Sequence, residues 1–202
     1  KELAQLAMAR VFKKGDYRSG YYRDQTFMMA KNLLTTQSFF AQLYSNTNLE
    51  DEPSSAGRQM NSHFSTRMLD SNGNWKNVSR EYNSSSDLSP TASQMPRLLG
   101  IAQASKIYKN YKINSSNFSN EGNEIAFGTI GNASTSEGLF FETLNAIGVH
   151  QVPAVISVWD DDYGISVDNS YQTTKSSISE VLKGFQRTKT QKGYEILTVK
   201  GW

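Results

Sequence analysis

The sequence predicts an α/β fold with a mostly parallel sheet flanked by helices. Two runs rich in β-branched residues, Glu124–Ile130 and Ala154–Trp159, enclose a segment with helical spacing, Ser134–Gly148. A strand, a helix and a second strand in this order form a right-handed crossover between parallel strands. Three further helix-like segments precede this unit, and no run of 18 apolar residues occurs in the chain.

The preceding helices are indicated by apolar periodicity. The chain opens in a helical register from Leu3 to Val11 with no capping residue before it, so we expect a fragment whose fold is incomplete at both ends. Asp24–Tyr44 lacks proline and glycine and has apolar residues at helical spacing, which predicts one substantial, largely buried helix. Pro96 opens another helix, because proline is tolerated in a first turn.

Two remaining segments complete the predicted organisation. Residues 45–90 are rich in Ser, Asn, Gly and charged residues, and so long a connection is uncommon in a compact domain. We expect a functional loop or an insertion within a single domain that spans residues 1–202. A last strand is predicted over Tyr194–Lys200.

Composition limits the classes of partner and site. The formal net charge is +2 over 202 residues and the basic residues are scattered, which predicts no nucleic-acid partner and no membrane partner. The chain has no cysteine, which excludes disulfides, thiolate zinc sites and a cysteine nucleophile. The absence of cysteine fits a reducing compartment, and we expect a cytoplasmic location.

Polar residues follow both strands of the predicted crossover unit. Gly131-Asn132-Ala133 follows the first strand, and Asp160, Asp161 and Asp162 follow the second. Parallel strands deliver these residues to the same edge of the sheet. Ser134 and Glu137 fit a capping box, so the helix is predicted to begin directly after the first turn, where free N–H groups suit phosphate. Carboxylates beside phosphate are typical Mg²⁺ ligands.

The two turns resemble the cofactor fingerprint of a known family, in which G-D/E-G and N-N are separated by a gap of similar length. Here 26 residues, 134 to 159, separate Gly131-Asn132-Ala133 from Asp160-Asp161. Four other segments match family motifs in the same order: Tyr22-Arg23, Phe39-Phe40-Ala41-Gln42, Gly57-Arg58-Gln59-Met60 with His63, and Ser89-Pro90 with Gln94 and Pro96. From about Gly20 to Ser166 the chain resembles the alpha-type half of the thiamine diphosphate-dependent 2-oxo acid dehydrogenases, chiefly the branched-chain kind.

The resemblance implies a thiamine diphosphate-binding fold and a role for each matching residue. Mg²⁺ would be held by side-chain oxygens of Asn132 and Asp161 and by the backbone carbonyl of Tyr163. Backbone N–H groups of Ala133 and Ser134 would bind the diphosphate. The residues implied to contact the cofactor or its metal are Tyr22, Arg23, Ser89, Thr91, Gly131, Asn132, Ala133, Ser134 and Asp161.

The other implied roles lie outside the crossover unit. Arg23 would neutralise phosphate charge and Tyr22 would contact the cofactor beside it. Ser89 and Thr91 would meet the aminopyrimidine through backbone atoms, and residues 45–90 would include a cofactor loop. His63 is a candidate catalytic residue by its motif alone, and a satisfied loop histidine is the alternative.

The family's activity implies further partners. A 2-oxo acid loses CO₂ on the cofactor, and its acyl group passes to the lipoyl arm of an acyltransferase. A beta-type, transketolase-like subunit or fused domain supplies the activating glutamate, typically in a heterotetramer. We therefore expect the 202-residue chain to be inactive by itself.

Two departures from the family pattern leave alternatives open. The amide comes first and the carboxylate second, at Asn132 and Asp161, whereas the family has the reverse order. Trp159 stands where branched-chain members often have a phosphate-binding arginine. The alternatives are a non-catalytic cofactor-binding or assembly module, a pyruvate- or acetoin-type enzyme, and a Mg²⁺ site for phosphoryl transfer as in receiver-like domains.

Overall fold

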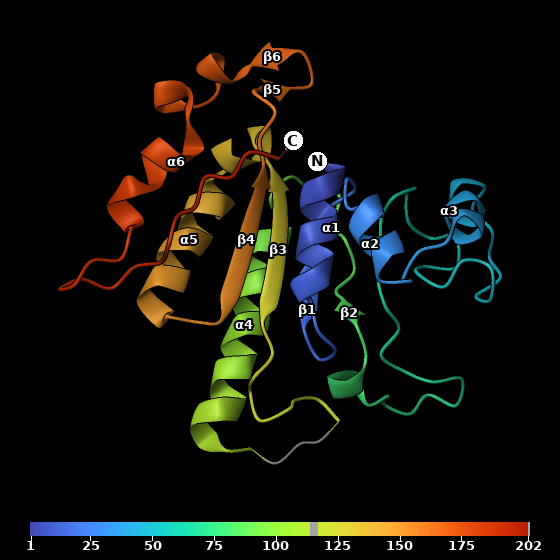
Figure 1. Ribbon diagram of the computed structural model, residues 1–202. Helices are drawn as coiled ribbons and strands as arrows, with labels where there is room; N and C mark the ends of the chain where they lie inside the picture. Colours follow the sequence, from blue (N-terminus) through green and yellow to red (C-terminus); the bar gives the residue numbers. More distant parts are fainter. Residues whose placement is uncertain (114–116, 202) are drawn as a thin grey trace.

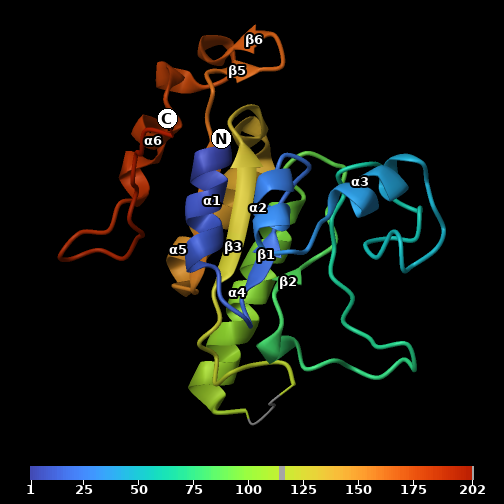
Figure 2. The same cartoon turned by 45° about the vertical axis from the view of Figure 1, so that its right-hand side comes forward.

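The computed structural model describes residues 1–113 and 117–201, and the chain forms three layers around a four-stranded parallel sheet. The strand order is β2-β1-β3-β4, with β1 (Tyr17–Ser19), β2 (Asn83–Ser84), β3 (Ala126–Gly131) and β4 (Ala154–Trp159). Figures 1 and 2 show α1 (Glu2–Val11) and α2 (Gln25–Ala30) on one face of the sheet, and α4 (Gln94–Tyr111) and α5 (Gly138–His150) on the other. The predicted α/β class is confirmed.

The two faces of β3 contact two separate hydrophobic cores. Ala126 and Ile130 belong to a core shared with α4 and α5, in which Leu98 is fully buried. Phe127 points to the other face, where the Phe12 ring lies 5.1 Å from it in an edge-to-face arrangement. This alternation follows from the period of two in a strand and fixes both helical layers on the sheet.

The predicted crossover unit is confirmed by the pairing of its two strands. β3 and β4 pair in parallel from Ala126 opposite Ala154 to Gly131 opposite Trp159. The predicted helices at the chain start and at Pro96 are present as α1 and α4.

The single helix predicted over Asp24–Tyr44 is wrong. The chain instead forms α2 and the shorter α3 (Thr36–Leu43), and only Gln42 of α3 is buried. Asn32 adopts a left-handed φ of 56°, which ends the first helical segment. Thr35 then starts the second segment, because its side chain and that of Ser38 form a reciprocal capping box.

The start predicted for the helix after β3 is also wrong. Residues Ala133–Ser136 form a 3₁₀ turn, and α5 begins only at Gly138. The backbone N–H and the hydroxyl of Thr135 both bond to the Asn132 carbonyl, which closes the turn on itself. Glu137 is the N-cap residue of α5, and its side chain makes no capping hydrogen bond.

The strand predicted over Tyr194–Lys200 is wrong as well. Tyr194 makes one isolated bridge to Gln186, and the remainder of the segment pairs with no strand among the described residues. The apolar side chains of Leu197 and Val199 are exposed. Alternation alone is therefore insufficient to form a strand where no partner backbone is available.

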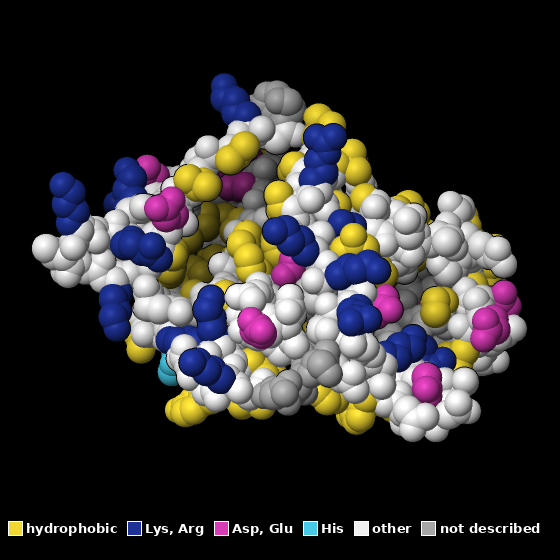
Figure 3. Space-filling model, turned by 60° about the horizontal axis from the view of Figure 1, so that its bottom comes forward, with side chains coloured by type: hydrophobic (Ala, Val, Ile, Leu, Met, Phe, Trp, Pro, Cys, Tyr) yellow, Lys and Arg dark blue, Asp and Glu magenta, His cyan; other side chains and the backbone are white. Residues whose placement is uncertain are grey.

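The other segments add short elements. These are η1 (Val78–Arg80), the antiparallel pair β5 (Tyr163–Gly164) and β6 (Val167–Asp168), η3 (Asn169–Tyr171), η4 (Thr174–Ser176), α6 (Ile178–Val181) and η5 (Leu182–Phe185). Residues 45–90 contain η1 and β2 as their only helix and strand in this structure. No helix in the described part of the chain is both long and apolar enough to cross a membrane. Basic and acidic side chains are interspersed on the face seen in Figure 3.

Candidate functional site

The sequence-predicted site residues follow the carboxyl ends of the four parallel strands. Because all four strands run in one direction, these ends share one edge of the sheet. The residues that follow β1, β2, β3 and β4 in turn are Tyr22 and Arg23, Ser89 and Thr91, Asn132 to Ser134, and Asp161 with Tyr163. The fold thus gathers at one edge segments that are up to 141 positions apart in the sequence, counted from Tyr22 to Tyr163.

This edge includes a point where the strand order reverses. β1 has β2 on one side and β3 on the other. The chain therefore runs from β1 to β2 on one side, and then crosses back to form β3 on the other side. In open α/β sheets, the loops diverge at such a point and leave a crevice that binds ligands. Tyr21, directly after β1, reaches across this point, and its hydroxyl lies 3.4 Å from where a Cβ on Gly131 would be.

Asn132 lies buried at the end of β3. Its backbone N–H donates to the Trp159 carbonyl at 3.3 Å, which places it beside the start of the aspartate run on β4. Its side chain is 3% exposed, and its Nδ2 has no hydrogen-bond partner among the described residues. The Tyr21 hydroxyl is likewise buried and without a partner in the described chain. Each of these two groups near the end of β3 indicates a place for a polar ligand, because an unpaired buried donor costs about 1–3 kcal/mol.

Asp161 is the more exposed member of the predicted metal pair. Its carboxylate accepts from Lys1 Nζ at 2.6 Å, and about half of its side-chain surface is accessible. Partial burial opposes ionisation, but the hydrogen bond and charge of Lys1, the Tyr163 backbone N–H and the charge of Arg23 outweigh it. The pKa of Asp161 therefore lies below its usual value, and this side chain carries a negative charge at the sheet edge.

The β5–β6 hairpin lies against the turn at Ala133. A Cβ added to Gly164 would lie only 2.7 Å from the Ala133 Cβ, and the Ser136 hydroxyl donates to the Gln172 carbonyl at 3.1 Å. The backbone of Tyr163 is thereby held beside the 3₁₀ turn, while half of its side chain is exposed. The structure therefore brings the backbone of Tyr163 close to Ala133, and the metal site stays a prediction.

No three His, Cys, Asp or Glu side chains converge on a possible metal position in the part of the chain that the structure describes. The predicted ligands of a cation at this edge are the Asp161 carboxylate, the Asn132 amide and the backbone carbonyl of Tyr163. Mg²⁺ commonly keeps waters and takes phosphate oxygens beside one or two carboxylates. The donor set therefore fits Mg²⁺ bound together with a phosphorylated ligand.

Tyr22 and Arg23 form an exposed pair above the reversal point. The Arg23 guanidinium lies 5.1 Å from the centroid of the Tyr22 ring, a cation–π distance. Gln5 of α1 donates to the Arg23 carbonyl at 2.8 Å and so fixes the backbone of this turn. Burial, reinforced by the charge of Asp24, raises the pKa of the neighbouring Tyr21, so its phenol stays protonated as a donor.

His63 and Ser89 are brought together from two loops. His63 Nε2 lies 2.9 Å from Ser89 Oγ, and Nδ1 lies 3.3 Å from the Asn61 carbonyl. Since a carbonyl can only accept, the tautomer that satisfies both bonds has the proton on Nδ1, and Nε2 accepts from Ser89. His63 is 7% exposed, whereas Ser89 and Thr91 are exposed. His63 therefore lies behind Ser89 rather than at the open surface.

A buried ion group was missed by the sequence analysis. Arg18 of β1 is fully buried and pairs with Asp24 at 2.7 Å and with Asp87 at 2.9 Å. Burial alone would lower the pKa of Arg18, but the charges of Asp87 and Asp24 outweigh it and raise the pKa. The sequence gives no local signal for this group, because an arginine is fully buried almost only when paired, and the partners lie 6 and 69 positions away.

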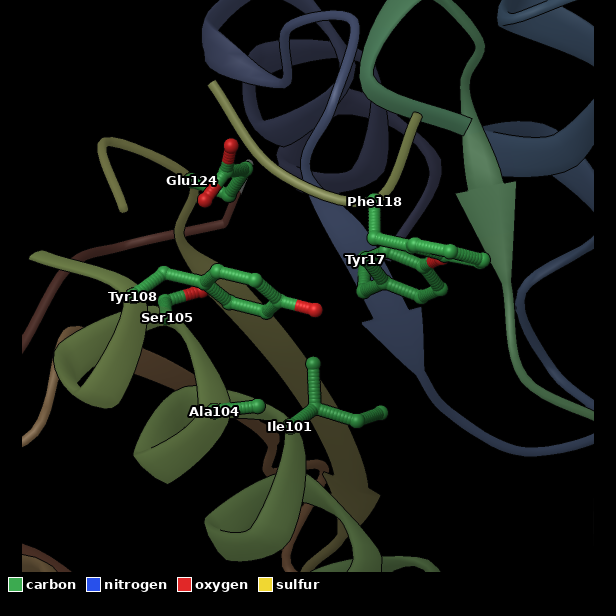
Figure 4. A pocket seen from close by; sticks show the side chains of 7 residues that line it. All are labelled: Tyr17, Ile101, Ala104, Ser105, Tyr108, Phe118 and Glu124. Atoms are coloured by element: carbon green, nitrogen blue, oxygen red, sulfur yellow. The ribbon is translucent and has the colours of Figure 1, made fainter. Parts of the chain in front are cut away.

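A cavity of about 250 Å³ lies at the opposite, amino-terminal edge of the sheet (Figure 4). Tyr17 of β1, Glu124 before β3 and Tyr108 of α4 line it. Burial and the charge of Glu124 raise the pKa of Tyr17 to about 12. Because strands begin at this edge, the cavity is separate from the predicted cofactor residues at the strand ends.

Comparisons with known proteins agree with the motifs at the strand ends. The model of a family described as "Dehydrogenase E1 component" matches residues 1–188. The chain is 31% identical over 190 residues to a 2-oxoisovalerate dehydrogenase subunit alpha of Bacillus subtilis (strain 168). The match covers 91% of this chain and 47% of that relative, so the chain spans about half the relative's length.

Proposed function

This chain belongs to the dehydrogenase E1 component family, and from that premise we propose that it is the alpha-type, cofactor-binding part of a branched-chain 2-oxo acid dehydrogenase. It would bind thiamine diphosphate and Mg²⁺ for the oxidative decarboxylation of a 2-oxo acid. The observation that supports this most strongly is the convergence of Arg23, Asn132 and Asp161 at one edge of the sheet. Membership of the family argues against a receiver-like phosphoryl-transfer site.

The proposed roles divide between metal and diphosphate. Asn132 and Asp161 would hold Mg²⁺ through side-chain oxygens, and Tyr163 through its carbonyl. The unpartnered Asn132 atom is the Nδ2 donor, so a cation requires the amide to turn over and present Oδ1. Lys1 would have to release Asp161, and such a half-exposed ion pair contributes only about 0–1 kcal/mol.

The remaining roles concern the diphosphate and the ring. The backbone N–H groups of Ala133 and Ser134, in the turn that follows Gly131, would bind the diphosphate, and Arg23 would neutralise its charge beside Tyr22. Ser89 and Thr91 would offer backbone atoms to the aminopyrimidine, with His63 supporting Ser89. When bound, thiamine diphosphate supplies the nucleophilic carbon for attack on the 2-oxo group.

A second candidate is a cofactor-binding or assembly module without catalysis. Trp159 favours it, because the indole is 8% exposed and donates to Asp24 at 3.4 Å, so this position gives no cation to a phosphate. Decarboxylation by the full-length protein produced together with its natural partner would exclude the module. Activity with pyruvate or acetoin in preference to branched-chain 2-oxo acids would identify a different substrate type.

Titration calorimetry of Mg²⁺ and thiamine diphosphate with the full-length protein tests the metal assignment. We expect Asp161→Asn to weaken Mg²⁺ binding more than about tenfold, because it removes a ligand and its charge. Asp160→Asn is the matched control, since its carboxylate accepts from the Asp162 backbone N–H at 3.1 Å. Equal losses from the two substitutions would refute the assignment.

The organisation around this site is proposed on the same basis. Residues 1–202 would form one alpha-type domain, with a cofactor loop within residues 45–90. The partners would be a beta-type transketolase-like subunit or fused domain and a lipoyl-bearing acyltransferase, in a cytoplasmic complex. The purified 202-residue chain should not decarboxylate 2-oxo acids, and measurable turnover by it would contradict this.

A further inference from the structure

A fully enclosed charge network lies directly beneath the candidate site. Arg18 provides the centre, and each of its guanidinium nitrogens is used. Nε bonds to Asp24 at 2.7 Å, Nη1 to Ser84 at 2.8 Å and Asp87 at 2.9 Å, and Nη2 to the Tyr21 carbonyl at 3.0 Å and Asp87 at 3.1 Å. A guanidinium has five N–H donors in a fixed fork, so the two carboxylates cannot move independently of it.

The Asp24 carboxylate accepts hydrogen bonds from residues of three strands, β1, β3 and β4. Its Oδ2 accepts from Arg18 of β1, from the Tyr21 backbone N–H at 3.3 Å and from the Thr129 hydroxyl of β3 at 2.5 Å. Its Oδ1 accepts from the indole N–H of Trp159 on β4 at 3.4 Å. The carboxylate is completely buried, so these bonds are not in competition with water.

Asp87 links β2 and the loop at Phe64 to Arg18 through hydrogen bonds. It follows β2 and makes two bonds to Arg18, at 2.9 and 3.1 Å. Its Oδ2 also accepts from the Phe64 backbone N–H at 3.0 Å, and its own N–H donates to the Phe64 carbonyl at 2.9 Å. The ends of all four strands and the loop at residue 64 are therefore joined through one arginine.

Five residues of the network lie within three positions of a residue with a proposed cofactor role. The pairs along the chain are Asp24 with Arg23, Phe64 with His63, Asp87 with Ser89, Thr129 with Asn132, and Trp159 with Asp161. None of the network side chains has been given a role in binding. Their common feature is that they hold the backbone from which the proposed ligands project.

We propose that Arg18, Asp24 and Asp87 are positioning residues that set the relative placement of the cofactor-binding loops, an inference that rests on the proposed function. Apolar residues of similar volume often stabilise a fold as well as a buried ion group does, because charges lose their hydration on burial. Stability alone therefore gives no reason for the group. The need to hold five loops in a fixed geometry gives such a reason, because the ligands of a metal and its phosphate must be positioned closely.

The test compares two buried carboxylates at opposite edges of the same strands. Asp24→Asn keeps the shape of the side chain but removes the charge that pairs with Arg18. Asp16→Asn is the matched control, because Asp16 is also buried and accepts two backbone N–H bonds, from Lys13 at 2.7 Å and Ile125 at 2.8 Å, at the amino-terminal edge. The full-length protein with its natural partner is titrated with Mg²⁺ and thiamine diphosphate, and its Tm is measured without cofactor.

We expect Asp24→Asn to raise the cofactor Kd about 10- to 100-fold, the range found when groups that orient a ligand are removed. Asp16→Asn should lower Tm by a similar amount yet change the Kd less than twofold. A third variant, Arg18→Met with Asp24→Asn and Asp87→Asn, should regain Tm relative to Asp24→Asn without regaining affinity.

Each outcome decides the proposal. Equal Kd changes for Asp24→Asn and Asp16→Asn, or affinity that returns with Tm in the triple variant, would show a merely structural network and overturn it. Wild-type protein that binds no thiamine diphosphate would overturn the proposed function as well. Should Asp24→Asn not fold, Thr129→Val decides, because it removes one donor to Asp24 at nearly constant volume. A Kd increase of about 3- to 10-fold would then support positioning, and an unchanged Kd would refute it.

Discussion

Gly20 gives the sharpest test of how tightly the buried ion group is packed. It lies between Arg18 and Asp24, and a Cβ added there would be 2.2 Å from Asp24 Oδ2 and 2.5 Å from both Arg18 Nε and Nη2. All three distances are far below van der Waals contact. The substitution Gly20→Ala must therefore separate the ion pair or move the backbone of the turn.

The expected magnitude follows from the burial of the two partners. Both Arg18 and Asp24 are 0% exposed, and disrupting a buried ion pair costs about 3–5 kcal/mol. For a chain of this size, that loss lowers Tm by roughly 6–20 °C. Equilibrium unfolding in urea, followed by circular dichroism, measures it as a lower midpoint with an unchanged slope.

Gly100→Ala is the control for a methyl group added where there is room. Gly100 is an exposed residue inside α4, and no described heavy atom lies within 4 Å of a Cβ placed on it. Alanine has the higher helix propensity, so this variant should gain up to about 1 kcal/mol. A Gly20→Ala protein within about 1 kcal/mol of wild type would show that Arg18 and Asp24 do not meet beside Gly20 as described.

Three further predictions concern other parts of the molecule. Gly164→Ala would bring a Cβ to 2.7 Å from Ala133, so the β5–β6 hairpin must shift, and we expect cofactor Kd in calorimetry to rise about tenfold; an unchanged Kd would contradict the placement of Tyr163. The pKa of Tyr17 is raised to about 12 in the folded chain, against 10.0 for an ordinary tyrosine, so the phenol ionises at lower pH in the unfolded chain. The free energy of unfolding therefore falls between pH 10 and 12, by at most about 2 kcal/mol. Tyr17→Phe should lose less stability than wild type between pH 9 and about 11 in urea unfolding, and an equal loss would refute this. Phe12→Ala should lose about 3–5 kcal/mol in the same assay, because Phe12 is 1% exposed among Phe27 and Phe127, and a loss below 1 would be inconsistent with that packing.

The parts of the fold that could be predicted are those in which local pattern and tertiary structure agree. β3 and β4 are apolar, β-branched and separated by a helix, and their parallel pairing follows from chain topology. By contrast, β1 and β2 contain only three and two residues, and their polar side chains, such as Arg18 and Asn83, give no alternation. They are strands because the neighbouring backbone of β3 and the Arg18 network hold them there.

The helix errors have a different cause. Asp24–Tyr44 has helical periodicity throughout, but a left-handed Asn32 and the capping box at Thr35 interrupt it. Ser134 resembles a helix cap in sequence, yet Thr135 bonds back to Asn132 and closes a 3₁₀ turn first. Short polar side chains compete with the helix for backbone groups, and sequence alone does not show which bond is preferred.

The location of the candidate residues at one sheet edge could be predicted, whereas their roles stay predictions. Arg23, Ser89, Asn132 and Asp161 were recognised by motif, and parallel strands place such motifs at one edge. The network beneath them could not be predicted, because Arg18, Asp24 and Asp87 become partners only when the ends of β1 and β2 meet. A buried charge group has no local sequence signal, since its stability depends on contacts distant in the chain.

The charges at this edge lead to one more physical conclusion. The buried group contains one guanidinium and two carboxylates, a net charge of −1, and Asp161 adds another negative charge above it. Arg23 is a single exposed cation, and Trp159 offers its indole N–H to Asp24 instead of a positive charge to a ligand. Lys1 pairs with Asp161, so these side chains carry three positive and three negative charges, and a diphosphate at the turn of Ala133 would meet no excess of positive charge. A divalent cation held by Asp161 would supply that excess, so the proposed cofactor should depend strongly on Mg²⁺ for its affinity.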